Sequence, residues 1–169
     1  GGINLPAVAG RINVGENSAP AFDDVNNDDR LDLVLGAKSG IITAYAGPQY
    51  RDVIASFPAI KLDNPSQPIF IDVNKDQKDD LVVYSPVPED APAGRTAKLY
   101  CYPAPDWKSD VNLLSSIAIP GSGRISAADI DYDNNNELIL VDKEGKINVY
   151  GFELKEGAPV EVVPKEGWW

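Results

Sequence analysis

The sequence has no histidine, no methionine and a single cysteine, Cys101, among its 169 residues. Without histidine or paired cysteines, a zinc or copper site is not expected. One cysteine cannot form an intrachain disulfide, so the fold must depend on core packing, bound metal or neighbouring chains, and we expect Cys101 to be buried. Because methionine is absent and the chain starts with Gly1 and Gly2, we expect a mature or excised product.

Long apolar runs and positive charge are also scarce. No run approaches the roughly 20 residues that a membrane-spanning helix needs, so we expect no membrane insertion. There are 15 basic residues against 26 acidic ones, for a net charge of -11. Nucleic-acid phosphates would repel such a chain, so nucleic acid is not an expected partner. A hydrophobic content of 43% is enough to form a real core. The acidic excess indicates bound cations instead of nucleic acid.

Three acidic segments repeat with one spacing. Each carries acidic or amide residues at positions one, three, five and nine, and leucine follows at once. The repeated residues are Asp24, Asn26, Asp28 and Asp32 in the first segment, Asp72, Asn74, Asp76 and Asp80 in the second, and Asp129, Asp131, Asp133 and Glu137 in the third.

Strand-like runs flank each acidic segment, and no helical periodicity is convincing. The predicted first strands span residues 19–22, 68–71 and 125–128, the second 31–35, 81–84 and 138–141, the third 41–46, 97–102 and 146–152, and the fourth 52–57, 111–119 and 159–163. We align Tyr45, Tyr100 and Tyr150 on the third strands. This alignment predicts a seven-residue insertion in the second unit, near residues 86–94.

Four strands per unit, repeated after 48 and 57 residues, are typical of β-propeller blades. The sequence predicts an all-β domain, or segment of one, with three consecutive four-stranded antiparallel blades at residues 18–62, 63–120 and 121–169. Residues 1–17 look like a fourth strand without its own blade, so we expect a surplus strand. Because propellers close with 4–8 blades, we expect self-association, as a closed ring or an open filament, or the remainder of a longer propeller.

The spacing of the acidic segments indicates calcium. Alternate side chains of a tight loop converge on one point, position nine closes the cage, and position seven offers its backbone carbonyl. Such oxygen ligands suit Ca²⁺, which accepts 6–8 of them, better than the compact octahedron of Mg²⁺. Asp and Asn also favour ordinary turns, but three loops with one spacing favour a metal. The backbone carbonyls predicted to bind the metal are those of Arg30, Lys78 and Asn135.

An EF-hand or dockerin-like loop shares positions one, three and five, but it needs an acidic ligand at position twelve and flanking helices. Position twelve is Leu35, Val83 and Leu140 in the three segments. The sequence therefore argues against that class of calcium loop.

The segments resemble the FG-GAP, or VCBS-type, repeats of integrin α-subunit propellers and of many microbial extracellular proteins. In that family the loop Asp-x-Asp/Asn-x-Asp-Gly-x-x-Asp-Leu joins the first two strands of a blade and binds calcium. The resemblance covers nearly the whole chain and implies about three Ca²⁺ ions at the residues above. Position six, usually glycine, is Asp29, Gln77 and Asn134 here, and glutamine tolerates a left-handed backbone less well. Glu137 is one methylene longer than the expected aspartate, which shifts the third site toward bidentate or water-bridged ligation.

We expect a non-catalytic extracellular module for adhesion, ligand binding or subunit assembly, with a protein or carbohydrate partner. The alternative is the propeller part of a secreted polysaccharide-active enzyme, since some polysaccharide lyases resemble this repeat type, or of a lectin. The sequence offers neither histidine nor a nucleophile elbow, so we name no catalytic residue. Trp107, Trp168 and Trp169 could stack on sugar rings, although packing inside the protein is the commoner role of tryptophan.

Overall fold

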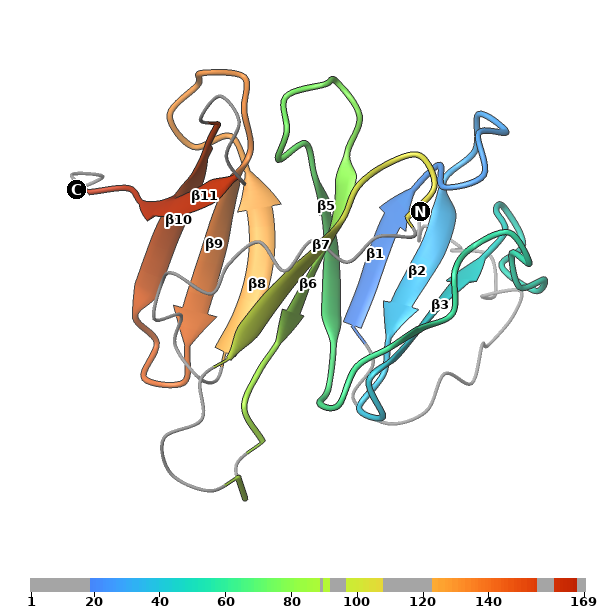
Figure 1. Ribbon diagram of the computed structural model, residues 1–169, viewed down its shortest axis with the longest axis horizontal. Coiled ribbons are helices and arrows are strands. Elements are labelled where there is room, and N and C mark those ends of the chain that lie inside the picture. The colour runs from blue at the N-terminus through green and yellow to red at the C-terminus, as the bar shows by residue number, and fades with distance from the viewer. Residues whose placement is uncertain (1–18, 89, 92–96, 108–122, 155–159, 167–169) are drawn as a thin grey trace, which may run out of the picture.

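The computed structural model describes residues 19–88, 90–91, 97–107, 123–154 and 160–166. In these ranges the chain forms eleven β-strands and no helix, which confirms the all-β prediction (Figure 1). No described segment is therefore a helix that could cross a membrane.

The strands form three antiparallel sheets, named A, B and C in chain order. Sheet A contains β1 (Ala19–Asp23), β2 (Asp32–Gly36), β3 (Ile41–Tyr45) and β4 (Ile60–Lys61). Sheet B contains β5 (Gln67–Ile71), β6 (Asp80–Ser85) and β7 (Lys98–Tyr102). Sheet C contains β8 (Gly123–Ala128), β9 (Glu137–Asp142), β10 (Ile147–Glu153) and β11 (Glu161–Pro164). Chain order equals spatial order in every sheet, so each sheet is a meander.

The first three strands predicted for each unit are confirmed to within two residues at either end. The fourth strand of sheet A was predicted at residues 52–57, and this is wrong. Only Val53 makes a bridge there, to Tyr45, and β4 forms later. The pairing with β3 ends after Ile54 because Phe57 donates its backbone N–H to the carbonyl of Ile54 at 3.1 Å, which forms a turn. Strand β11 confirms the fourth strand of sheet C, whereas predicted strands 111–119 and 1–17 lie outside the described residues.

Sheet B lies between the other two and contributes to two cores. Successive side chains of a strand point to opposite faces. On β6, Val82 and Tyr84 pack into a cluster with residues of sheet C. Leu81 and Val83 pack into a second cluster with residues of sheet A. All six residues of β6 are buried. The first strands also adjoin, β1 beside β5 and β5 beside β8, so the sheets stand in a row (Figure 1).

The strand register corrects one alignment. The leucine after each acidic segment faces a tyrosine on the third strand: Leu33 faces Tyr45, Leu81 faces Tyr102 and Leu138 faces Tyr150. The equivalent of Tyr45 is therefore Tyr102, not Tyr100, and the insertion in the second unit is nine residues long instead of seven. The two tyrosines are two residues apart on β7 and point to the same face, so the sequence pattern alone did not distinguish them.

Candidate metal centres

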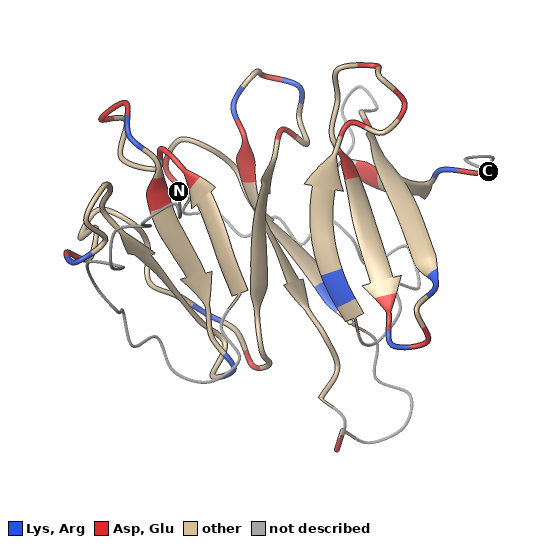
Figure 2. Ribbon diagram, turned by 180° about the vertical axis from the view of Figure 1, so that it is seen from behind, with Lys and Arg blue, Asp and Glu red and all other residues tan. Residues whose placement is uncertain are grey.

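The three acidic segments form loops that connect the first two strands of each sheet. We call them loop 1 (residues 24–32), loop 2 (72–80) and loop 3 (129–137). Figure 1 shows the loops projecting from the same end of the row of sheets, and Figure 2 shows acidic residues gathered there. All fifteen residues predicted as metal ligands lie in these loops or at their last position, which begins the second strand.

The first aspartate of each loop is fixed by the loop backbone. Its two carboxylate oxygens accept the N–H groups of positions five and six. These N···O distances are 3.0 and 2.7 Å for Asp24, 3.1 and 2.8 Å for Asp72, and 3.1 and 3.0 Å for Asp129. The same hydrogen bonds in all three loops show that one backbone conformation is repeated.

Two positions of each loop have a left-handed backbone. At position six, the φ angles are 63° at Asp29, 67° at Gln77 and 66° at Asn134. Gln77 thus takes the same conformation as its counterparts, although glutamine disfavours it. At position four, the φ angles are 59° at Asn27, 60° at Lys75 and 61° at Tyr132. Sequence reasoning missed position four, because these three residues share no property that signals such a backbone.

The ninth residue of each loop is a buried carboxylate. Asp32 and Asp80 are 0% exposed and Glu137 is 1% exposed. Each accepts the backbone N–H of position two, at 3.2, 3.2 and 3.0 Å respectively. Burial raises the pKa of Asp80, while hydrogen bonds from backbone N–H groups act in the opposite direction. The ninth carboxylates therefore face into the loops from the buried start of the second strand.

In sheets A and B, a turn after the third strand supplies a second donor to this carboxylate. The amide of Gly47 donates to Oδ1 of Asp32 at 2.9 Å, and the amide of Ala104 donates to Oδ1 of Asp80 at 2.9 Å. We call residues 46–50 and 103–107 the aromatic turns. Sequence reasoning missed them, although a proline and, two residues later, an aromatic residue follow the third-strand tyrosine at the same distance in both units.

Each aromatic turn ends in a ring that packs on the first strand. Tyr50 and Trp107 have φ angles of 52° and 53°. Tyr50 meets Phe22 edge to face with ring centroids 6.0 Å apart, and Trp107 meets Phe70 in the same way at 5.8 Å. Trp107 is only 5% exposed and belongs to the core between sheets A and B, so it is not a sugar-stacking platform. Trp168 and Trp169 lie outside the described residues.

Loop 3 receives a lysine instead. Nζ of Lys165 lies 2.6 Å from Oδ2 of Asp131 and 2.7 Å from Oε1 of Glu137, with Oδ2 of Asp133 at 3.9 Å. Burial lowers the pKa of Lys165, but the hydrogen bonds to Asp131 and Glu137 outweigh it and raise the pKa. Sequence reasoning missed Lys165 because it lies 28 residues beyond Glu137, outside the repeated segment.

Loop 1 has an oxygen atom suited to a calcium ion. Oδ1 of Asn26, at position three, is buried and has no hydrogen-bond partner within the described part of the chain. An unpaired buried carbonyl oxygen is costly, and such oxygens are ligands that Ca²⁺ prefers. Loop 2 has the same ligand types and backbone, although Oδ1 of Asn74 there accepts the N–H of Asp76 at 2.9 Å.

Carboxylates converge most closely in loop 3. Oxygens of Asp129, Asp131 and Glu137 lie within 4.8 Å of one another, the one such acidic group found among the described residues. The cation beside them in the structure is the ammonium group of Lys165. With that group in place, loop 3 does not fit a metal ion.

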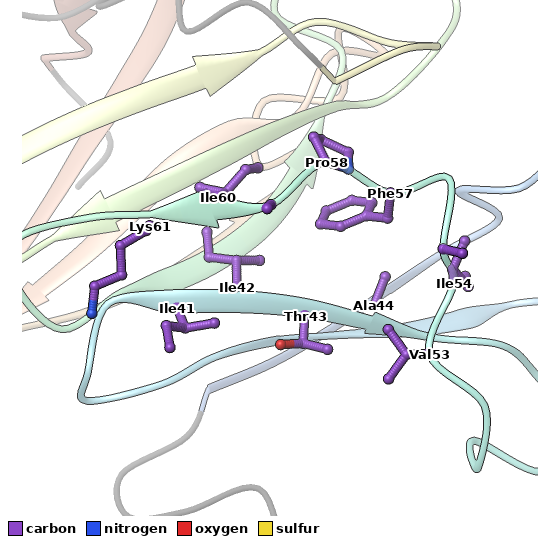
Figure 3. A pocket seen from close by; sticks show the side chains of 12 residues that line it. Ile41, Ile42, Thr43, Ala44, Val53, Ile54, Phe57, Pro58, Ile60 and Lys61 are labelled. Carbon is purple, nitrogen blue, oxygen red and sulfur yellow. The ribbon is translucent and has the colours of Figure 1, made fainter.

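A separate apolar hollow of about 440 Å³ lies on sheet A between β3, residues 53–59 and β4 (Figure 3). None of its lining residues belongs to the three loops. Ile41 and Val53 at its border are 46% and 58% exposed. Thr43 and Lys61 alone in the lining have polar side chains. The hollow therefore lacks the converging polar groups typical of a small-molecule site.

No protein-family model matches this chain, and no curated protein matches it. The candidate centres rest on the residues and their geometry.

Proposed function

We propose that this chain is a non-catalytic, calcium-stabilised β-propeller module that serves adhesion, ligand binding or subunit assembly outside the cell. The observation that carries the proposal is the repeated loop backbone, with oxygen-bearing side chains at the same positions each time. Its calcium ions would be held by the side chains at positions one, three, five and nine, together with the carbonyl of position seven.

The cost of this backbone favours a metal loop over an ordinary turn. A turn with two left-handed positions normally uses glycine or asparagine there. Lys75 and Gln77 of loop 2 take that conformation at a cost of roughly 1–2 kcal/mol each. Such a conformation persists when another interaction offsets its cost. Neutralisation of the gathered carboxylates by a divalent ion is an interaction of sufficient size.

The arrangement of the sheets is consistent with propeller blades. Each sheet is a meander, successive sheets share a core, and the first strands of neighbouring sheets adjoin. Three blades are fewer than the 4–8 of closed propellers. The proposal therefore includes a cover for the outer sheets, either further copies of this chain or further blades of a longer protein.

Calcium would be structural and weakly bound. Extracellular calcium modules bind with dissociation constants of about 10⁻⁴–10⁻³ M, so such sites fill outside the cell. Each bound divalent ion would offset two units of the net charge of -11. Removal of the ions would leave mutually repelling carboxylates in the loops that held them, which lowers the free energy of unfolding.

Calcium titration of chelated protein by calorimetry, with thermal unfolding in calcium and in chelator, tests the proposal. We expect binding in the range above and a higher midpoint in calcium, with about 2.7 kcal/mol per site at a hundredfold excess over the dissociation constant. Asp28→Ala should lose stability mainly in calcium, whereas Asp63→Ala, at an exposed residue between sheets A and B, should behave as the wild type. A thermal unfolding midpoint that is the same in calcium and in chelator would contradict the proposal.

A further inference from the structure

The third sheet lacks the aromatic turn that serves the other two loops. In sheet C, β10 continues to Glu153 and pairs with β11, so that Phe152 lies opposite Val162. Phe152 occupies the place of Gly47 and Ala104, the residues whose amides bind the ninth carboxylate in loops 1 and 2. The first strand of sheet C also has Ala127 at the place of Phe22 and Phe70.

Lys165 is built into the sheet that replaces this turn. Its backbone N–H donates to the carbonyl of Val149 at 2.9 Å, which extends the pairing of β11 with β10. Its aliphatic stem lies against Gly151, where an added Cβ atom would be 2.9 Å from Cε of Lys165. Glycine weakens a strand interior and often marks a close approach of another group. Here the group that approaches is the lysine side chain.

The ammonium group lies among loop oxygens that a metal ion would need. Glu137 is 1% exposed, and a buried carboxylate requires a cation or hydrogen bonds. Its Oε2 accepts the loop amide of Ile130 and its Oε1 accepts the ammonium of Lys165. The same ammonium group pairs with Asp131. A calcium ion and this ammonium group would require the same oxygens, so they exclude each other.

We infer that Lys165 is a tethered cation that takes the place of a metal ion in loop 3, so that the chain binds divalent cations in loops 1 and 2 only. The inference refines the proposed function and rests on it for the two occupied loops. It lowers the expected stoichiometry from about three Ca²⁺ ions to two.

The test is a calorimetric calcium titration of the full chain and two variants. The wild type should bind two ions. Lys165→Met, which keeps the length of the side chain without the charge, should bind three. Lys143→Met is the matched control, because Lys143 follows β9 in the same sheet, lies outside the three loops and has a side chain that is 72% exposed. This variant should bind two ions, because removing a lysine charge away from loop 3 does not open the loop to a metal ion.

Thermal unfolding gives a second readout. In chelator, Lys165→Met should unfold about 10 °C below the wild type, because three carboxylates lose their cation, and calcium should restore much of the difference. If this variant is unfolded in chelator, folding on addition of calcium but not of equal ionic strength of sodium chloride gives the same support.

Three ions on the wild type, or no additional ion on Lys165→Met, would overturn the inference. No ion on the wild type with one on Lys165→Met would instead overturn calcium binding by loops 1 and 2 and leave the role of Lys165 standing.

Discussion

In loops 1 and 2 the ninth carboxylate accepts two backbone N–H groups, whereas in loop 3 it accepts one backbone N–H group and a lysine ammonium group. The difference extends well beyond the loop. It includes glutamate for aspartate at position nine, a continued β10 in place of an aromatic turn, and alanine for phenylalanine on the first strand. The residue at position nine therefore differs together with the first and third strands of its sheet. The reason is that a buried carboxylate needs a hydrogen-bond donor, and a change in the carboxylate requires a change in the element that supplies the donor.

The largest expected effect comes from the ring that anchors an aromatic turn. Phe70→Ala should lower the free energy of unfolding by about 3–5 kcal/mol, because it removes a buried ring from beside Trp107. Phe22→Ala is the matched variant in sheet A and should cost clearly less, since Phe22 is 49% exposed. Urea denaturation of both variants measures the difference. Equal losses of stability would mean that the different burial of Phe22 and Phe70 does not determine how much each ring contributes.

The next effect concerns the ninth carboxylate itself. Asp80→Ala leaves the amides of Val73 and Ala104 without their acceptor, and hydrogen bonds to charged groups contribute about 1.5–3 kcal/mol each. We expect a loss of about 3 kcal/mol even in chelator. Asp63→Ala provides the exposed control. If urea unfolding shows a loss only in calcium, Asp80 is a metal ligand alone and has no structural role in the apo protein.

A smaller effect is expected at position six. Gln77→Gly relieves a left-handed backbone that glutamine disfavours, and part of the gain is offset by the entropy of glycine in the unfolded chain. We expect a stabilisation of roughly 0.5–1 kcal/mol by chemical denaturation. Asn134→Gly in loop 3 should change stability by only a few tenths of a kcal/mol, because asparagine already tolerates this backbone. A loss of stability in Gln77→Gly would contradict the prediction.

The smallest expected effect on stability comes from charged residues that line the hollows between loops. Loops 1 and 2 face each other across a hollow whose charged residues are Asp23, Asp24, Lys78 and Asp79. In the hollow between loops 2 and 3, two lysines, Lys75 and Lys165, lie beside carboxylates of both loops. Burial and then the charge of Asp72 raise the pKa of Asp79 above 3.8. Burial also raises the pKa of Asp23, to which the charge of Asp79 adds.

A carboxyl whose pKa is raised on folding contributes most to stability below its unfolded pKa, and this contribution is lost as pH rises through the folded value. Asp79→Asn should therefore slightly stabilise the chelated protein at pH 7, and the gain should disappear as pH falls below about 4. Thermal unfolding across that pH range checks this. The opposite trend would show that the Asp79 carboxylate is stabilised by folding.

The parts of the molecule predicted from sequence are those encoded locally. The loop ligands lie within nine consecutive residues, and the three strands next to each loop follow from alternation and turn residues. Lys165 reaches loop 3 from the residue that follows β11, the last strand of sheet C, so no local pattern in loop 3 indicates it. The aromatic turns were overlooked because Tyr45 was aligned with Tyr100 instead of Tyr102, which put the proline and aromatic residue that the two turns share out of register.

The position of sheet B between two cores has a consequence for how the molecule opens. Strand β6 is buried along its whole length and contributes side chains to both clusters. In an array whose units contact only their neighbours, an end unit can detach with the loss of one interface, but a middle unit loses two. The amide hydrogens of β6 should thus be the slowest to exchange with solvent, and sheets A and C should open in partial fluctuations that leave β6 protected.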